Sequence, residues 1–397
     1  MTASGAKFNS CARLWKAWLG CALVFGGTLA PAAGAQGGSS PGVAPAPGHR
    51  NLPEIPASLR PAFSPPAELA SDLGAFRPVL RFDDGRPVQS AADWAARRRE
   101  ITAAWERVLG PWPPLLAEPR MLVLTSRHRE TFIQHRVRLP VAPGQTAEGW
   151  LLIPEGRGPF PAVFVPYYEP ETSIGLGQPL RDFGYQLTRR GFVSLSIGSP
   201  GGDARRPDRG EARCQPLSFL AYVAANCANA LAALPQVDPN RVGVVGHSYG
   251  GKWALFAAAL DDRFAAVAVS DPGIVWDEAR PNVNYWEPWY LGLDPTVARK
   301  PGVITPDNPR TGAYRTLFES GHDLHELHAL IAPRPFFVSA GAEDPPERWR
   351  ALNHTRAVNR LLGFPDRVAM THRAGHTPTP ESNAELYAFF EWALGAP

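Results

Sequence analysis

The sequence has little lysine, little cysteine and almost no net charge outside its first residues. Its formal charge is +3, but Lys7, Arg13 and Lys16 lie within residues 1–35, where no acidic residue occurs. Basic and acidic residues therefore balance over the rest of the 397-residue chain. A chain this close to neutral lacks the positive surface that binds nucleic acid or an anionic membrane. We therefore expect neither partner.

Long apolar runs are also missing beyond the N-terminus. Residues 17–29 are apolar, follow a positively charged start and precede the small residues Ala33, Gly34 and Ala35. This order is typical of a cleaved secretory signal. No later segment reaches the roughly 18 apolar residues needed to cross a bilayer. We expect residues 1–35 to be a signal peptide, the mature protein to be secreted or periplasmic, and no membrane span.

Cysteine is scarce, and of the four in the chain only Cys214 and Cys227 lie beyond the signal. In an oxidising compartment they can form a disulfide or remain two buried thiols, and the sequence leaves both open. Residues 36–66 are rich in Pro, Gly, Ser and Ala, which predicts a linker or a disordered arm. The remaining residues, 67–397, are long enough for one globular domain with a large core.

The pattern of apolar residues in this domain predicts an α/β fold. Residues 91–109 form an expected helix, and three expected strands at 121–125, 131–139 and 149–153 resemble an antiparallel edge of a larger sheet. Further strands then alternate with helices, which indicates a mostly parallel sheet with helices on both faces. The expected strands are 161–165, 192–197, 242–245, 264–270, 335–340 and 367–371. An aromatic-rich insertion at about 272–323 follows the strand at 264–270, and we expect it to form a cap.

The motif that indicates the chemistry is GHSYG at residues 246–250, a G-x-S-x-G sequence between an apolar strand and a helix. A tight turn there holds Ser248 in a strained conformation above the sheet edge, and Gly246 and Gly250 leave space for it. Ser248 is therefore the expected nucleophile. The backbone N–H of Tyr249 lies at a helix N-terminus, where it can stabilise an oxyanion.

A serine nucleophile needs a base, and the base needs a carboxylate to orient it. His376 is the expected base because it follows the last expected strand, whereas His372 lies within the end of that strand. Asp344 is the expected acid because it follows the next-to-last strand. Asp271, after the strand that follows the nucleophile helix, and Glu343 remain alternatives for the acid.

Substrate contacts are expected from the loops around this site. A second oxyanion donor is expected near Tyr167 or Tyr168, in the loop after the strand at 161–165. Trp286 and Trp289 of the cap offer aromatic faces that suit sugar rings, although a cap packed by its own aromatic residues is the alternative. Arg205, in the arginine-rich loop at 198–214, offers a guanidinium for a substrate carboxylate, although a solvated surface loop is the alternative.

We expect no metal and no cofactor. The nearest pattern to a zinc motif is His322, His325 and His328 with Glu326, and its spacing differs from H-E-x-x-H, which needs histidines four residues apart.

The chain resembles the bacterial secreted carbohydrate esterases of the α/β-hydrolase superfamily, the set around acetyl xylan esterases, glucuronoyl esterases and dienelactone hydrolases. The resemblance covers roughly residues 95–395 and rests on residues 246–252, on LHALIAPRP at 327–335 and on AGH at 374–376. Glucuronoyl esterases carry a lysine four residues after the nucleophile, which contacts a hydroxyl of the uronate, and Lys252 stands at that position.

The same resemblance extends to the acid and to the residue after the nucleophile. Asp271 matches the acidic position of glucuronoyl esterases, but Tyr249 stands where they typically carry an arginine. The resemblance implies a serine esterase that acts on acetyl or glucuronoyl esters of a polysaccharide through an acyl-enzyme. The alternatives are an α/β-fold serine peptidase, a dienelactone-type hydrolase of small molecules, and a catalytically silent binding module.

Overall fold

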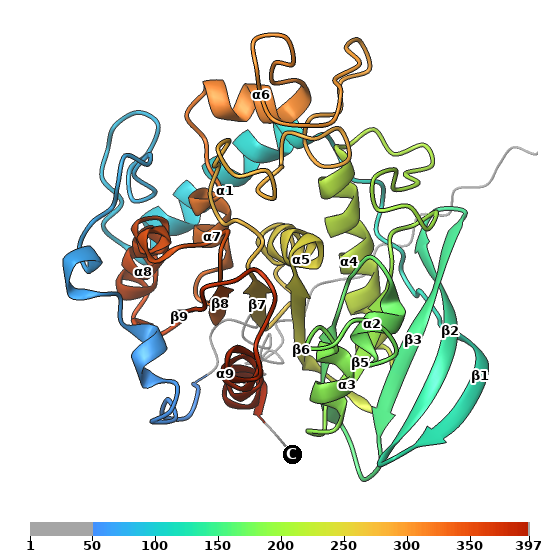
Figure 1. Ribbon diagram of the computed structural model, residues 1–397. Coiled ribbons are helices and arrows are strands. Elements are labelled where there is room, and N and C mark those ends of the chain that lie inside the picture. Colours follow the sequence, from blue (N-terminus) through green and yellow to red (C-terminus); the bar gives the residue numbers. More distant parts are fainter. Residues whose placement is uncertain (1–50, 396–397) are drawn as a thin grey trace, which may run out of the picture. The chain divides into compact units, whose positions relative to one another are not determined.

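A single mixed sheet organises the part of the chain that the structure describes, residues 51–395 of a computed structural model (Figure 1). The strand order is β1-β2-β3-β5-β4-β6-β7-β8-β9. The strands are β1 (Leu122–Arg129), β2 (Phe132–Ala142), β3 (Gln145–Pro154), β4 (Phe160–Phe164), β5 (Val193–Ile197), β6 (Val237–His247), β7 (Ala266–Ser270), β8 (Phe336–Ala340) and β9 (Val368–His372). The expected signal at residues 1–35 lies outside the described residues.

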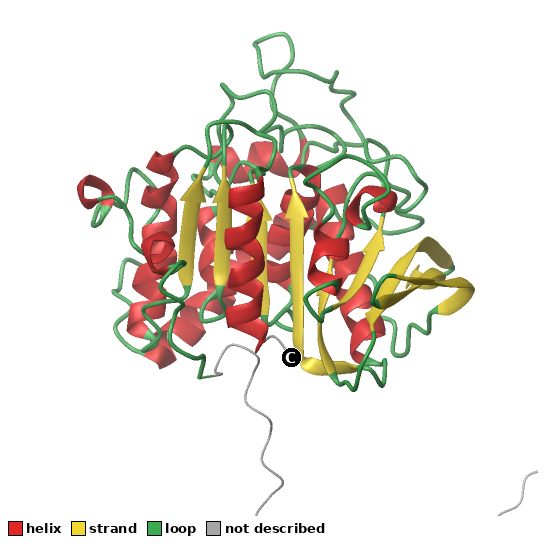
Figure 2. Cartoon of the chain, turned by 60° about the horizontal axis from the view of Figure 1, so that its bottom comes forward, coloured by secondary structure: helices red, strands yellow, loops and turns green. Residues whose placement is uncertain are grey.

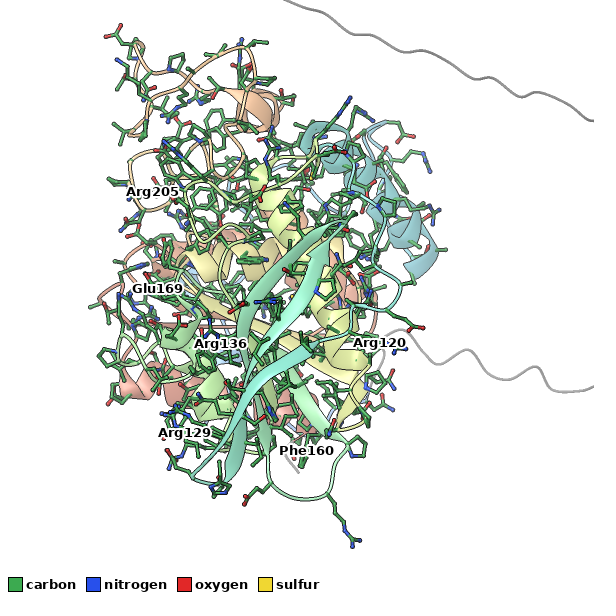
Figure 3. The ribbon with its side chains drawn as sticks, turned by 90° about the vertical axis from the view of Figure 1, so that its right-hand side faces the viewer. Arg120, Arg129, Arg136, Phe160, Glu169 and Arg205 are labelled. Carbon is green, nitrogen blue, oxygen red and sulfur yellow. The ribbon has the colours of Figure 1, made fainter. Side chains whose placement is uncertain are left out.

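The sheet has an antiparallel edge and a parallel centre. Strands β1, β2, β3 and β5 pair antiparallel, whereas β5, β4, β6, β7, β8 and β9 run parallel. Figure 3 shows the antiparallel edge from the side, with Arg129 and Arg136 on its strands. Strands β4, β5, β7 and β8 are buried along their whole length, as expected where helices cover both faces.

Two layers of helices cover the sheet (Figure 2). The helices are α1 (Ala91–Leu109), α2 (Pro170–Ser173), α3 (Phe183–Thr188), α4 (Pro216–Ala232), α5 (Tyr249–Leu260), α6 (Gly312–Glu319), α7 (His325–Ile331), α8 (Trp349–Leu361) and α9 (Pro380–Phe390). Alternate strand residues enter different clusters. Val244 packs with residues of α1, α4 and α5, whereas Val245 packs with residues of α3 and α9. The expected α/β fold with helices on both faces is confirmed.

Residues 36–66 were expected to be a linker or a disordered arm, and the described part of this range, residues 51–66, packs against the domain instead. Leu59 and Phe63 are buried, and the Phe63 ring packs edge-on against Trp392 with 5.2 Å between centroids. The Trp392 Nε1 donates to the Pro53 carbonyl at 2.9 Å. Proline-rich composition indicated an arm here, but two large apolar side chains fix the segment on the α9 face of the sheet.

The cap, residues 272–323, leaves β7 and returns to α7, with α6 as its helix. Its aromatic side chains mostly pack on one another, and Tyr285, Trp286, Tyr290 and Tyr314 are all buried.

Elsewhere in the described chain, Cys214 and Cys227 are both buried and not joined to each other. No helix among the described residues is long and apolar enough to cross a membrane.

Candidate active site

Ser248 occupies the turn between β6 and α5 in a strained backbone conformation. Its φ is 52° and its ψ is −111°, a backbone conformation that residues other than glycine rarely adopt. A Cβ on Gly246 would lie 2.1 Å from the Gly250 carbonyl oxygen, and one on Gly250 would lie 2.1 Å from that of Pro166. The two glycines are therefore required for the turn to pass between the helix and the neighbouring loop. The Ser248 N–H donates to the Ser270 carbonyl at 2.8 Å, which ties the turn to the end of β7.

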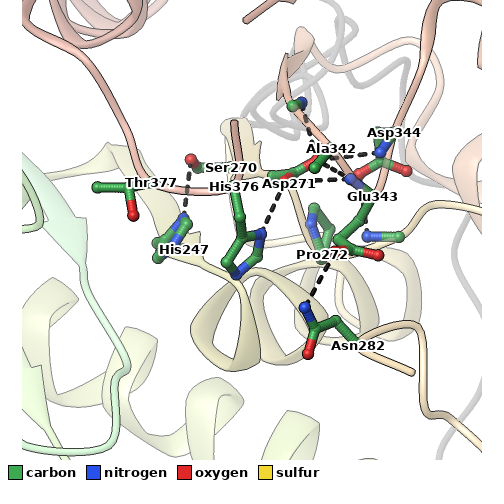
Figure 4. A network of polar contacts seen from close by, with 12 residues as sticks. His247, Ser270, Asp271, Pro272, Asn282, Ala342, Glu343, Asp344, His376 and Thr377 are labelled. Atoms are coloured by element: carbon green, nitrogen blue, oxygen red, sulfur yellow. Dashed lines mark hydrogen bonds and ion pairs between the residues drawn. The ribbon is translucent and has the colours of Figure 1, made fainter. Parts of the chain in front are cut away.

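His376 lies in the loop after β9, with its Nδ1 2.7 Å from Oδ2 of Asp271 (Figure 4). The histidine side chain is 25% exposed and the aspartate side chain is fully buried. Oδ1 of Asp271 accepts backbone N–H bonds from Gly341, Glu343 and Asp344 at 2.8, 3.0 and 3.0 Å. These donors stabilise the ionised carboxylate that the histidine faces.

Asp344, the acid expected from the sequence, has a different contact set. Its two carboxylate oxygens accept the backbone N–H groups of Gly273 and Ile274, at 2.9 and 2.6 Å. Burial, together with the nearby charge of Asp271, raises the pKa of Asp344 to about 6. The assignment of Asp344 as the partner of His376 is therefore wrong, and the structure brings the alternative, Asp271, to that position.

The second alternative for the acid, Glu343, also has a partner other than His376. Its Oε1 accepts from Nδ2 of Asn282 in the cap at 3.0 Å. Asp344 and Glu343 thus both bond to the start of the cap. Their sequence neighbourhood indicated a triad acid because the loop after β8 is a common place for one, but here both carboxylates attach the cap to that loop.

The expected contact of Lys252 with substrate is also corrected by the structure. Its side chain is buried, with 2% of the residue exposed. Its ammonium donates to the carbonyl oxygens of Pro272 and of Asn282, the latter at 2.9 Å, and lies 4.7 Å from the centre of the Tyr285 ring. Burial lowers its pKa to about 8, against the opposing effect of nearby carboxylates, of which Asp344 is the strongest. The lysine fastens the base of the cap and does not line an open surface.

Two backbone positions were expected to donate to an oxyanion. Tyr249 is the first residue of α5, and the first N–H groups of a helix lack partners within it. The N–H of Tyr167 instead donates to the Ile197 carbonyl at 3.4 Å, a long bond that competes with the expected role. The next residue, Tyr168, is 40% exposed and stacks on the Tyr249 ring with 4.6 Å between centroids.

The expected aromatic and arginine contacts divide into buried and accessible ones. Trp286 is 1% exposed and donates its Nε1 to the Gly302 carbonyl, so its expected contact with substrate is contradicted. Trp289 is half-buried, and the guanidinium carbon of Arg205 lies 5.7 Å from the centre of its ring. Both residues line a cavity of about 530 Å³ together with Arg206. Figure 3 shows Arg205 and Glu169 toward one end of the sheet and Phe160, at the start of β4, toward the other.

The described residues hold no group of three or more His, Cys, Asp and Glu side chains arranged for a metal ion. Two of the three histidines of the expected pattern, His322 and His325, have hydrogen-bond partners of their own. His322 contacts Oε2 of Glu326 at 2.6 Å through Nδ1, and His325 contacts the Arg77 carbonyl at 2.8 Å. Sequence reasoning missed three residues around His376, namely Arg373, Ser270 and His247, whose only signal was that each lies close in sequence to a triad candidate.

Comparison with known proteins bears on the fold of the chain and on its relatives. The model of the prolyl oligopeptidase family matches residues 224–300, which include Ser248 and Asp271. Among solved structures, a glucuronoyl esterase from Solibacter usitatus superimposes with a TM-score of 0.64 at 20% identity, covering 81% of this chain and 98% of that one. The chain has the α/β-hydrolase fold. A putative acetyl xylan esterase from Bacteroides fragilis shares this fold with a TM-score of 0.53 at 16% identity, over 76% of this chain and 80% of that one.

Curated relatives of this chain point in the same direction. A 4-O-methyl-glucuronoyl methylesterase from Podospora anserina is 25% identical over 78% of this chain, which spans 66% of that relative, just under two thirds of its length. A protein of the same name from Phanerochaete carnosa is 22% identical over 86% of both chains. The resemblance to serine esterases stated from the sequence is therefore confirmed.

Proposed function

We propose that this α/β-hydrolase is a serine esterase that cleaves glucuronoyl esters of plant or microbial polysaccharides. The observation that carries the proposal is the 2.7 Å contact between His376 and Asp271, next to the strained turn of Ser248. A serine, a histidine and a buried carboxylate that share one sheet edge have the chemistry of acyl transfer. The names of the similar proteins support the uronate as the acyl part.

In the proposed reaction, His376 takes the proton of the Ser248 hydroxyl through Nε2 while the serine oxygen attacks the ester carbonyl. Asp271 holds the proton on Nδ1 of the histidine and stabilises the imidazolium that forms. The N–H of Tyr249, with a donor from the loop of Tyr167 and Tyr168, stabilises the oxyanion. The alcohol leaves with the histidine proton, and water, activated by the same histidine, then releases the acid from Ser248.

Arg205 and Trp289 are proposed to contact the sugar part of the substrate. Arg205 is exposed and its guanidinium makes no hydrogen bond or ion pair to another described side chain, which leaves it available for a carboxylate. The change Arg205→Gln is expected to raise KM for a glucuronoyl oligosaccharide severalfold. Arg157→Gln, in an exposed turn before the start of β4, is a matched control that should leave KM unchanged. Equal effects of the two variants would remove Arg205 from the proposal.

The test of the proposed function is initial rates of the mature chain on benzyl glucuronate and on acetylated xylo-oligosaccharides, with Ser248→Ala beside it. We expect Ser248-dependent release of benzyl alcohol at the higher kcat/KM. A preference for the acetyl ester would replace the uronate with an acetyl group as the substrate. No Ser248-dependent rate on either ester would overturn the esterase proposal while leaving the fold intact.

A serine peptidase is the second candidate, because the matching family model is that of prolyl oligopeptidases. Proline-containing peptide amides test it in the same assay, and cleavage of these in preference to esters would favour it.

We also propose secretion, which the composition of residues 1–35 supports. Its test is whether a reporter fused to those residues is exported and cleaved after Ala35.

A further inference from the structure

The loop that carries His376 is held by one buried arginine. Arg373 is 7% exposed and begins this loop directly after β9. Its Nη2 donates to the carbonyl oxygen of His376 at 2.6 Å, and its Nε donates to that of Thr377 at 2.9 Å. Its Nη1 donates to the Ser339 carbonyl at 2.8 Å. One planar guanidinium therefore joins the backbone of the base to the end of β8.

The same guanidinium reaches β7 through Ser270. Nη2 of Arg373 lies 3.2 Å from Oγ of Ser270, whose carbonyl accepts the Ser248 N–H at 2.8 Å. Ser270 also directly precedes Asp271. Ser270, which is buried, therefore contacts the Ser248 turn through its backbone and the His376 loop through its side chain.

His247 completes this arrangement beside the base. Its Nδ1 lies 3.1 Å from Oγ of Ser270, and its ring centroid lies 4.6 Å from that of His376 (Figure 4). An arginine only donates, so Oγ of Ser270 accepts from Arg373 and its own proton has Nδ1 of His247 as an acceptor. Burial, and next the charge of His376, lower the pKa of His247 well below its ordinary value. A neutral ring therefore packs against the ring that becomes charged during the reaction.

We propose that Arg373 and Ser270 are positioning residues for the triad, which hold the His376 loop and the Ser248 turn in one register. The inference rests on the proposed function, because that function makes His376 the base and Ser248 the nucleophile. Neither side chain is proposed to contact substrate. Their action is to keep the imidazole in the orientation that proton transfer needs, and displacement of a catalytic group by about 1 Å costs roughly 100-fold in rate.

The test uses Arg373→Lys, Ser270→Ala and the double variant. Lysine keeps the positive charge but loses the planar fork that binds the carbonyl groups of Ser339, Ala340, His376 and Thr377 together. We expect Arg373→Lys to lower kcat about 10- to 100-fold with KM nearly unchanged, since a displaced base weakens the chemical step and not substrate binding. Ser270→Ala is expected to act in the same direction. The double variant should lose less than the product of the two single losses, because both variants break one shared contact.

Arg334→Lys is the matched control. Arg334 is 2% exposed and, like Arg373, donates to several backbone carbonyls, among them those of Ala258 and Asp261 at 2.7 and 2.9 Å. It precedes β8, at the end of the sheet opposite to the site. Both lysine variants are expected to lower the unfolding midpoint, but only Arg373→Lys should lower kcat per folded molecule. Equal kcat losses in the two variants would reduce Arg373 to a stabilising role and overturn the proposal.

Two further readouts do not depend on the substrate. The first is the rate at which a fluorophosphonate modifies Ser248, which needs the base but no particular ester. The second is the low-field proton resonance of the bond between His376 and Asp271, which is expected to shift or broaden in Arg373→Lys and to stay in Arg334→Lys. An unchanged resonance and an unchanged labelling rate in Arg373→Lys would refute positioning. No labelling of wild-type Ser248 would instead refute the proposed nucleophile.

Discussion

Replacing Asp271 by asparagine should remove nearly all activity, because of how its two oxygens are bound. Oδ1 accepts three backbone N–H groups, so the amide oxygen of an asparagine takes that place and its NH2 turns toward His376. Two donors cannot face each other, so the ring moves its proton from Nδ1 to Nε2 and can no longer accept the proton of Ser248. The loss in kcat for this substitution in a serine triad is roughly 10⁴-fold, about 5 kcal/mol.

Asp344→Asn is the matched control for this prediction. Asp344 is buried like Asp271 and also accepts two backbone N–H groups, so asparagine costs stability there as well. Its kcat per folded molecule should fall less than about tenfold, because no contact with the base is lost. The assay is kcat on benzyl glucuronate per folded molecule, with the folded fraction taken from the unfolding transition of each variant. Near-normal turnover of Asp271→Asn, with a collapse in Asp344→Asn, would show that the orienting carboxylate had been misassigned.

The remaining predictions concern the cap and the turn. The folded pKa of Lys252, about 8, lies below the ordinary 10.5, so the unfolded chain binds more protons between these values and the contribution of Lys252 to stability rises from pH 8 to pH 10.5, by up to about 3 kcal/mol. The difference in unfolding free energy between wild type and Lys252→Met, measured with urea, should therefore be more in favour of wild type at pH 10 than at pH 7.5. A difference that does not depend on pH would contradict the reasoning. Gly250→Ala, whose Cβ would meet the Pro166 carbonyl at 2.1 Å, should cost roughly 3 kcal/mol by chemical unfolding and abolish activity, whereas tolerance of alanine would mean that the turn can move. Trp286→Ala should cost about 3–5 kcal/mol through a cavity in the cap, and a change in KM without a change in the unfolding midpoint would restore its expected contact with substrate.

The strongly patterned elements could be predicted from the sequence because their apolar spacing is unambiguous. The helix expected at 91–109 has those bounds in the structure, where Ser90 caps it by accepting the Asp93 N–H at 3.1 Å. The serine turn was recognisable because only glycine permits its close approaches. The parallel strands follow from short apolar runs between helices.

The choice of the acid could not be made from the sequence. Asp271 and Asp344 each follow a parallel strand, and β7 and β8 are neighbours in the sheet, so both carboxylates reach the same edge. The contact that separates them depends on the path of the His376 loop, which local sequence does not determine. Lys252 was misread for a related reason, since the cap that buries it is an irregular segment without periodicity.

The N-terminal segment was misread because composition describes an average and packing depends on single side chains. Residues 36–66 have the composition of an arm, yet Leu59 and Phe63 within them are buried. In the cap, a high aromatic content was visible, but the side on which each ring lies was not. Trp286 and Trp289 are three residues apart, and only the second is accessible.

The bonds from Asp344 to Gly273 and Ile274 limit how this active site can change over evolution. The acidic residue of a serine triad can occupy either of two neighbouring strand ends. Here the second position is already occupied by a carboxylate, but that carboxylate anchors the first residues of the cap. A move of the acid from Asp271 to Asp344 would release the cap before it restored the triad, so intermediates would lose stability as well. The cap thus makes the present choice of acid difficult to reverse.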